Sequence, residues 1–258
     1  MVEYDVTPDL IETVRKIARE AGEIILEIYN SDFAVRAKDD RTPVTEADEK
    51  SENHIRESLE KLTPEIPFIG EEIYAAGHRP DISGGLFWLV DALDGTKEFI
   101  QRLDEFTVNI ALVENSVPKF GVVYAPAKSE MYWGGPPGAF AESKTMPPHA
   151  INARPAATDG LVAVMSRSHR GAEDDFLSNY NVKGKIRSGS SLKFCLIAAG
   201  EADIYPRLAG TSEWDTAAAH AVLAAAGGSV CNLDGDDLIY GKNDVLNPHF
   251  IALGCLAK

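Results

Sequence analysis

The sequence predicts a layered fold in which helices pack on both faces of β-sheets, an α+β or α/β sandwich. Two amphipathic helical segments open the chain, a run of strands separated by Pro and Gly follows, and strands alternate with helices in the second half. Helices and sheets bury their apolar faces by stacking in layers around a shared core. A chain of 258 residues can build such a core as one large domain or as two smaller ones in close contact.

The first two elements are predicted to be amphipathic helices. One begins at Thr7-Pro8, a helix-start signal, and carries an apolar stripe at helical spacing, made of Leu10, Ile11, Val14, Ile17, Ala18, Ala21, Ile24, Ile25 and Ile28. The other opens at Thr45, because Thr45 and Asp48 have the spacing of a capping box. Each helix therefore presents one apolar face to a core.

The remaining elements follow from short apolar runs bounded by turn residues. Strands are predicted at 67–70, 86–90, 106–113, 117–124 and 130–133. The second half predicts a strand at 161–165, a helix after Ser168, a helix at 190–199, a strand at 202–205, a helix at 214–226, and strands at 229–232 and 250–253. The Pro- and Gly-rich stretch 134–155 separates the halves. We expect an N-terminal half over residues 1–150 and a C-terminal half over 151–258.

Composition restricts the partners and the location. The net charge is −15, from 25 basic and 40 acidic residues, which argues against a nucleic acid or an anionic membrane as the main partner. We expect no signal peptide and no membrane span, because the N-terminus carries acids early and no apolar run reaches about 18 residues. Three cysteines without C-x-x-C spacing indicate reduced thiols and hence a cytoplasmic protein.

Three acidic segments stand at the ends of predicted elements. Glu71 and Glu72 follow a short strand, Asp91 and Asp94 follow the apolar run at 86–90, and Asp215 precedes an alanine-rich helix. Alone, each is an ordinary turn or cap residue. Together they supply the carboxylate oxygens that Mg²⁺ prefers. The Gly95-Thr96 turn offers backbone N–H groups that can bind a phosphate oxygen, so the sequence predicts a Mg²⁺-dependent phosphate site.

A second phosphatase signature is excluded. The segment Leu93-Asp94-Gly95-Thr96 resembles the D-x-D-G-T motif of aspartyl-phosphate phosphatases, but their nucleophile would fall on Ala92. No Ser, Cys or His nucleophile motif is present either, which favours attack by water.

The same motifs resemble those of the inositol monophosphatase superfamily of Mg²⁺-dependent, lithium-sensitive phosphatases, over nearly the whole chain. They are Glu71-Glu72, Asp91-Ala-Leu-Asp94-Gly-Thr96, and Trp214-Asp215 with its alanine-rich helix and Gly227-Gly228. The resemblance implies an αβαβα sandwich. Gly95-Thr-Lys-Glu-Phe99, Ser166-Arg-Ser-His169, Gly189-Ser-Ser-Leu-Lys193-Phe and Tyr205-Pro-Arg207 resemble the 3′(2′),5′-bisphosphate nucleotidase branch. The family usually has Pro at the position of Ala92, a departure that we expect to soften the turn without disabling the site.

The resemblance implies a role for each matched residue. Two or three Mg²⁺ would be bound by Glu71, Asp91, the carbonyl of Leu93, Asp94 and Asp215. Asp48 and Thr96 would orient the attacking water. The backbone amides of Gly95 and Thr96 would bind the scissile phosphate. The rest of the nucleotide would be contacted by His169, Ser190, Lys193 and Arg207.

The implied activity is hydrolysis of the 3′-phosphate of adenosine 3′,5′-bisphosphate to AMP and phosphate, in a monomer or homodimer, with phosphorylated sulfate-donor nucleotides as a second substrate. Two alternatives stay open. One is an inositol or sugar monophosphate phosphatase, whose substrate has no use for both Lys193 and Arg207. In such relatives a carboxylate tends to lie on the loop before Trp-Asp, where Glu213 is the only acid here. The other is a non-catalytic module that binds Mg²⁺ or a nucleotide.

Overall fold

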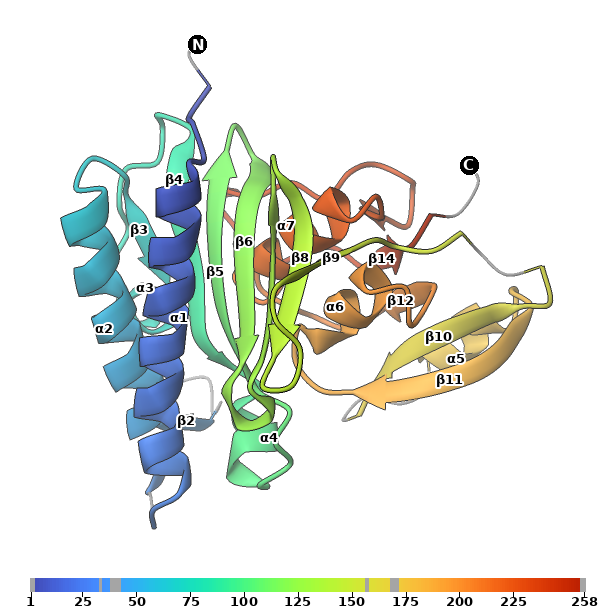
Figure 1. The fold of residues 1–258 in the computed structure, drawn as a ribbon, viewed down its shortest axis with the longest axis horizontal. Coiled ribbons are helices and arrows are strands. Elements are labelled where there is room, and N and C mark those ends of the chain that lie inside the picture. The colour runs from blue at the N-terminus through green and yellow to red at the C-terminus, as the bar shows by residue number, and fades with distance from the viewer. Residues whose placement is uncertain (1–2, 33, 38–42, 156–157, 168–171, 256–258) are drawn as a thin grey trace.

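The computed structural model describes residues 3–32, 34–37, 43–155, 158–167 and 172–255, and its elements form layers (Figure 1). Helices α1 (Pro8–Tyr29) and α2 (Glu46–Leu62) cover one face of a seven-stranded sheet. Helices α6 (Leu192–Ala198) and α7 (Ala217–Ala225) lie between this sheet and a five-stranded sheet, and α5 (Ala172–Leu177) packs on the outer face of the second sheet. The αβαβα sandwich expected from the sequence is confirmed.

The seven-stranded sheet has its strands in sequence order from β3 to β9. They are β3 (Phe68–Gly70), β4 (Leu86–Asp94), β5 (Thr107–Glu114), β6 (Val117–Ala125), β7 (Glu130–Gly135), β8 (Gly138–Ser143) and β9 (His149–Ile151). Only the β3–β4 pair is parallel. Alternate residues of β4 face opposite layers: Trp88 and Val90 pack with α1 and α2, and Phe87 and Leu89 pack with α7. Both faces of this sheet are therefore buried.

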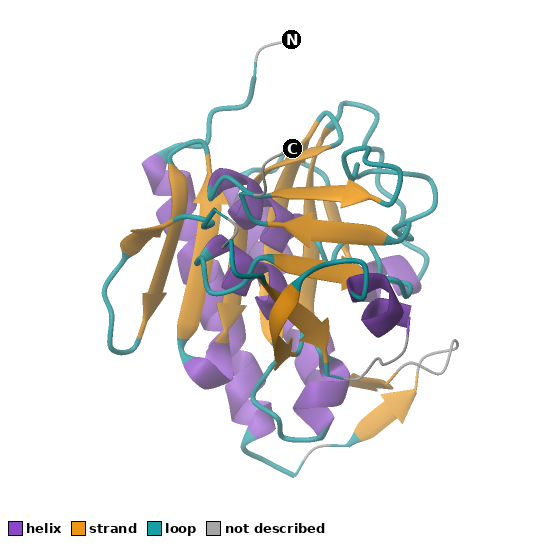
Figure 2. Ribbon diagram, turned by 90° about the vertical axis from the view of Figure 1, so that its right-hand side faces the viewer, coloured by secondary structure: helices purple, strands orange, loops and turns teal. Residues whose placement is uncertain are grey.

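The five-stranded sheet has the order β11-β10-β12-β14-β13 and lies in front of the first sheet in Figure 2. Its strands are β10 (Leu161–Ser166), β11 (Val182–Ser188), β12 (Ile204–Arg207), β13 (Ser229–Asn232) and β14 (Phe250–Leu253). On β10, Val164 faces the central helices while Ala163 and Met165 face Leu177 of α5. None of the helices in the described ranges is long and apolar enough to cross a bilayer.

Local sequence explains how the helices form and pack. Pro8 occupies the first turn of α1, and the Thr7 hydroxyl accepts a hydrogen bond from the Leu10 N–H at 3.2 Å. Apart from His220, helix α7 consists of apolar residues on all sides, as its position between two sheets requires. It approaches the first sheet so closely that a Cβ added to Gly121 would lie 2.2 Å from the Ala218 carbonyl oxygen, so only glycine fits there.

Several elements differ from the prediction. Strands β8, β9 and β11, the short pair β1 (Val35–Ala37) and β2 (Pro43–Thr45), and the single-turn helices α3 (Glu71–Ala75) and α4 (Thr96–Ile100) were not predicted. Helix α7 begins at Ala217 rather than at 214, because 214–216 form a turn that positions Asp215. The stretch 134–155, predicted as a boundary, contains two strands that extend the first sheet. All three cysteines are free thiols.

Candidate active site

The C-terminal end of β4 explains why two acids follow a buried strand. Asp91 pairs with Asn109 and Asp94 pairs with Thr107 on β5, but the ladder is irregular between these two pairs. In this irregular stretch the Leu93 N–H donates to Asp91 Oδ1 at 2.9 Å, an Asx turn. The turn forms with Ala92, which is 2% exposed, at the position where the family that the sequence resembles usually has Pro. The irregularity brings both carboxylates to the same end of the sheet.

Three of the predicted metal ligands converge. Carboxylate oxygens of Glu71, Asp91 and Asp215 all lie within 4.8 Å of one another. Glu71 begins α3 directly after β3, which runs parallel to β4, so both chains leave the sheet at the same edge. Asp215 comes from the turn before α7, where its Oδ2 accepts a hydrogen bond from the Ser212 N–H at 2.8 Å. These residues form what we call the acidic cluster.

The electrostatics of the acidic cluster favour a bound cation. Burial raises the pKa of Asp91 well above its ordinary value, and the neighbouring Glu71, Asp94 and Asp215 raise it further. Burial also raises the pKa of Asp215 well above its ordinary value, with contributions from Asp94 and Glu71. Buried like charges of this kind are stabilised by a divalent cation, and a set of carboxylate oxygens is the donor set that suits a hard ion such as Mg²⁺.

Asp48 and Thr96 are in direct contact. The Thr96 hydroxyl donates to Asp48 Oδ1 at 3.1 Å and lies 3.4 Å from the carbonyl oxygen of Leu93. The other carboxylate oxygen of Asp48 accepts from the N–H and the hydroxyl of Thr45 at 2.8 and 2.7 Å. Burial raises the pKa of Asp48, although the hydrogen bonds from Thr45 and Thr96 counteract it. Asp48 therefore caps α2 and orients Thr96 at once.

A cavity adjoins the acidic cluster and contains two buried cations. Its walls include Asp94, Gly95 and Asp215 on the acidic side and Ser190, Lys193 and Arg207 on the other. Lys193 is 6% exposed and Arg207 is 8% exposed. The Lys193 ammonium donates to the Ser190 carbonyl and lies 5.3 Å from the Tyr205 ring, and Arg207 donates to the Gly210 carbonyl at 3.0 Å. A cavity with both signs of charge suits a multiply charged anion and its counterions.

Burial and the neighbouring Asp94 act in opposite directions on the pKa of Lys193, and Ser190 holds the Asp94 carboxylate in place. Burial lowers the pKa of Lys193 to about 8, although Asp94 raises it. The Ser190 hydroxyl donates to Asp94 Oδ2 at 2.6 Å, and burial raises the pKa of Asp94 against the effect of Lys193. Gly95 has φ 93°, the left-handed conformation that glycine adopts without strain, and it is the N-cap of α4. His169, the remaining predicted contact, lies outside the described residues.

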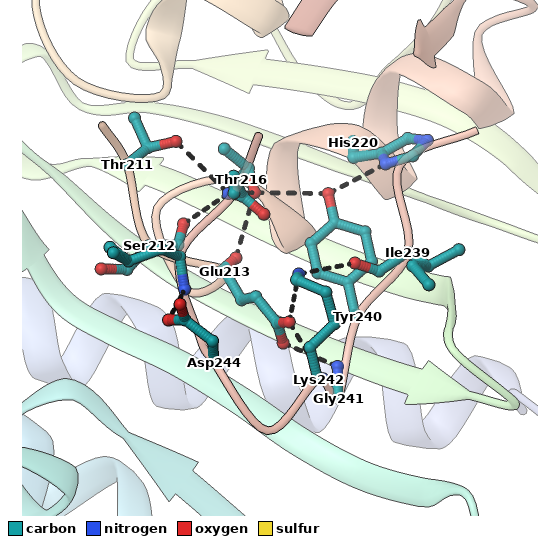
Figure 3. Close-up of polar contacts among 12 residues, drawn as sticks. Thr211, Ser212, Glu213, Thr216, His220, Ile239, Tyr240, Gly241, Lys242 and Asp244 are labelled. Carbon is teal, nitrogen blue, oxygen red and sulfur yellow. Dashed lines mark hydrogen bonds and ion pairs between the residues drawn. The ribbon is translucent and has the colours of Figure 1, made fainter. Parts of the chain in front are cut away.

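Glu213 does not face the acidic cluster. Figure 3 shows its carboxylate directed at Gly241 and Lys242, whose N–H groups donate to it at 2.6 and 3.1 Å. The loop before Trp214 therefore contributes no carboxylate to the cavity from this position.

Other residues near the site were missed by sequence reasoning. Glu98 lines the cavity from the same segment as Thr96. Glu105 accepts two hydrogen bonds from Arg167 at 2.8 Å and one from the Gly189 N–H at 2.9 Å, and so ties two loops of the cavity together. Thr107 and Asn109 lie on β5 behind Ser190 and Ser191. Only Glu98, through its place in the Gly95–Phe99 motif, carried a signal in the sequence.

Similarity to known proteins extends over nearly the whole chain. The family model of the inositol monophosphatase family matches residues 8–257. The chain is 42% identical over 247 residues to the 3′(2′),5′-bisphosphate nucleotidase CysQ of Escherichia coli (strain K12), a match that covers 93% of this chain and 98% of that relative. It is also 42% identical over 239 residues to the protein of the same name from Buchnera aphidicola, with coverage of 90% and 87%.

Solved structures agree. CysQ from Bacteroides thetaiotaomicron, described as a bacterial member of the inositol monophosphatase family, is 37% identical with a TM-score of 0.81, and the match covers 96% of this chain and 98% of that one. An inositol monophosphatase from Thermotoga maritima, 24% identical with a TM-score of 0.77 and coverage of 95% and 92%, shares the fold. With the same motifs on the same fold, this chain belongs to the inositol monophosphatase family.

Proposed function

We propose that the protein is a Mg²⁺-dependent 3′(2′),5′-bisphosphate nucleotidase that converts adenosine 3′,5′-bisphosphate to AMP and phosphate. The observation that carries this proposal is the pair of buried cations, Lys193 and Arg207, in the cavity beside the acidic cluster. An ammonium and a guanidinium that line the same cavity attract a ligand with negative charge. A substrate with one phosphate at the acidic cluster and a second phosphate in the cavity supplies it, as the substrates named for the CysQ relatives would.

The metal ligands in this proposal are Glu71, Asp91, the carbonyl oxygen of Leu93, Asp94 and Asp215, holding two or three Mg²⁺. The convergence of three of these carboxylates and the raised pKa of Asp91 and Asp215 support the assignment. When bound, Mg²⁺ lowers the pKa of a coordinated water and neutralises charge on the entering and leaving oxygens.

The protein's own groups orient the reactants. Because the Thr96 hydroxyl donates its proton to Asp48, its lone pairs are left to accept a hydrogen bond from the attacking water. The backbone amides of Gly95 and Thr96, at the start of α4, bind the scissile phosphate. The water oxygen forms a bond to phosphorus and the water gives up a proton, the bond from phosphorus to the 3′-oxygen breaks, and that oxygen takes up a proton to leave as a hydroxyl.

The substrate's second phosphate and its nucleoside are assigned to Lys193, Arg207, Ser190 and His169. Lys193 and Arg207 line the cavity within reach of one ligand, and Ser190 forms its wall next to Asp94. An inositol monophosphate has no second phosphate to place beside the two cations, and Glu213 is bound to Gly241 and Lys242 rather than facing the cavity. Both observations favour the nucleotide over the inositol phosphate.

The test is phosphate release with Mg²⁺ from adenosine 3′,5′-bisphosphate and inositol 1-phosphate in parallel, with and without lithium. We expect strong preference for the nucleotide and inhibition by lithium. Asp94→Asn should abolish turnover while the circular dichroism spectrum stays unchanged. Preference for inositol phosphate would overturn the substrate assignment, and no phosphate release from either compound would favour a binding module.

A further inference from the structure

A chain of buried hydroxyl groups leads from strand β5 to the side chain of Asp94. Thr107, Asn109 and Ser191 are 0–2% exposed, and Ser190 is 8% exposed. The Ser190 hydroxyl is in close contact with the Thr107 hydroxyl, which lies 2.8 Å from the Ser191 hydroxyl. The Ser191 hydroxyl in turn lies 2.7 Å from the terminal amide of Asn109. We call these three hydroxyl groups, together with the Asn109 amide at their end, the hydroxyl chain.

The number of protons available decides which group donates and which accepts in each hydrogen bond of the hydroxyl chain. Each hydroxyl has a single proton, and an ionised carboxylate only accepts. Ser190 therefore donates to Asp94 Oδ2 across 2.6 Å and must accept from Thr107. Because the proton of Thr107 is used there, the 2.8 Å contact between Thr107 and Ser191 needs the proton of Ser191.

The amide of Asn109 is then the only possible donor at the far end. It meets the Ser191 hydroxyl at 2.7 Å and the Thr107 hydroxyl at 3.2 Å, and neither has a proton left for it. With Oδ1 facing these hydroxyls, Nδ2 would be buried with no hydrogen-bond partner among the described residues. With Nδ2 facing them, both contacts have a proton, and the atom left over is a carbonyl oxygen, which is less costly to leave unpaired than an N–H.

We propose that the hydroxyl chain is a positioning device for Asp94: it holds Oδ2 as an acceptor and leaves Oδ1 to bind the cation. Thr107 is its central link, because the Thr107 hydroxyl contacts both Ser190, which donates to Asp94, and Ser191. This inference shares one assumption with the proposed function, namely that the acidic residues bind a divalent cation.

The hydroxyl chain also connects the acidic side of the cavity with its basic side. Ser190 has φ 52°, a left-handed conformation that is strained for serine, and its carbonyl accepts the hydrogen bond from the Lys193 ammonium. The residue that orients Asp94 therefore also anchors Lys193. Thr107 supports both through its contacts with Ser190 and Ser191 at the start of α6.

The experiment measures Mg²⁺ binding to the metal-free protein by isothermal titration calorimetry, without substrate. Thr107→Val keeps the shape and removes the hydroxyl, and we expect it to weaken Mg²⁺ binding about tenfold, as is usual for partners of metal ligands. Thr107→Ser restores the hydroxyl and should bind within about threefold of wild type. Ser191→Ala breaks the chain one link further away and should weaken binding less than Thr107→Val.

Thr63→Val is the matched control, because Thr63 is a buried threonine whose hydroxyl accepts from Trp88 Nε1 at 2.9 Å, away from the site. It should lower the Tm without changing Mg²⁺ affinity. Wild-type affinity in folded Thr107→Val, or equal losses in Thr107→Val and Thr107→Ser, would overturn the proposal. If Thr107→Val does not fold, wild-type affinity in Ser191→Ala is the overturning result. Substrate preference plays no part in this measurement, so failure of the proposed activity is seen separately.

Discussion

Lys242 binds the buried carboxylate of Glu213, and this ion pair fastens the loop that carries Asp215. The Glu213 carboxylate, 1% exposed, accepts hydrogen bonds from the Lys242 ammonium and from the N–H groups of Gly241 and Lys242 (Figure 3). Backbone hydrogen bonds add to it: the Glu213 N–H donates to Val245 at 2.8 Å and the Asn247 N–H donates to Thr211 at 2.9 Å. Residues 211–216 are therefore held by residues 240–247.

The first prediction is that this pair stabilises the fold and does not select the substrate. Lys242→Met leaves a buried carboxylate with only its two N–H donors, so we expect a loss of about 2 kcal/mol in the free energy of unfolding. Glu213→Gln should leave the ratio of activities on adenosine 3′,5′-bisphosphate and inositol 1-phosphate unchanged. Urea denaturation and the two phosphatase assays measure these effects. A selective change in inositol phosphate hydrolysis would mean that Glu213 reaches the substrate.

A second prediction concerns charge repulsion in the acidic cluster. Asp91→Asn keeps an acceptor for the Leu93 N–H but removes one buried negative charge beside Glu71 and Asp215. The metal-free variant should be more stable than wild type by about 1 kcal/mol, because burial and like charges disfavour the ionised form. Mg²⁺ should raise the Tm of wild type and leave that of Asp91→Asn nearly unchanged.

Asp5→Asn makes the same change of charge on an exposed aspartate and serves as the control. Its Tm should follow wild type both in a chelator and in Mg²⁺. If Asp91→Asn lowers the stability of the metal-free protein, repulsion is not the dominant effect at this position.

Lys193 leads to a third prediction, on substrate selectivity. Lys193→Met keeps the methylene chain and removes the charge from the cavity. Loss of a charged hydrogen bond should lower kcat/KM for adenosine 3′,5′-bisphosphate by about 10- to 100-fold. Adenosine 3′-phosphate, which has no second phosphate, should lose much less. Equal losses on both substrates would assign Lys193 a structural role through its hydrogen bond to Ser190.

A site residue could be predicted from the sequence when its neighbours along the chain fix its place in the fold, and not when only tertiary structure does. Asp91, Asp94 and Asp215 were recognisable because each follows or precedes an apolar run that fixes where its side chain emerges. Thr107 and Asn109 look like ordinary strand residues, and their connection to Asp94 exists only through the pairing of β4 with β5 and the position of α6.

The same reasoning accounts for the missed strand β11. In this strand Lys183, Lys185 and Arg187 alternate with less polar residues, and most of its side chains are exposed or half-exposed at the sheet edge. The sequence of such an edge strand cannot be distinguished from that of a solvent-exposed loop. The direction of Glu213 was also beyond sequence reasoning, because its partner Lys242 is fixed by tertiary structure alone.

The pKa of Lys193 gives a fourth prediction. At a pKa of about 8 the ammonium is charged at neutral pH and loses its proton as the pH rises through 8. Because kcat/KM reports ionisations of the free enzyme, its value for adenosine 3′,5′-bisphosphate should fall above about pH 8. Lys193→Arg, whose guanidinium stays charged, should lack this fall. A fall that persists in Lys193→Arg would assign the ionisation to another group.

His220 provides the last prediction, on stability at acid pH. Its Nδ1 lies 2.9 Å from the Tyr240 hydroxyl, which donates to Thr216 at 3.3 Å, so His220 Nδ1 is the donor in this contact (Figure 3). Burial lowers its pKa to about 4 from the ordinary 6.5. The unfolded chain therefore takes up a proton at a higher pH than the folded one. The contribution of the neutral histidine is complete above pH 6.5 and is lost as the pH falls toward 4.

His220→Gln keeps an N–H donor for Tyr240 and cannot titrate. The difference in unfolding free energy between wild type and this variant should shift by about 2 to 3 kcal/mol against wild type between pH 7 and pH 4.5. Urea denaturation at both pH values measures it, and the many carboxylates of this acidic chain cancel in the comparison. His249→Gln makes the same replacement at an exposed histidine and is the matched control. A difference between wild type and His220→Gln that stays constant with pH would show that His220 is protonated as easily in the folded protein as in the unfolded chain.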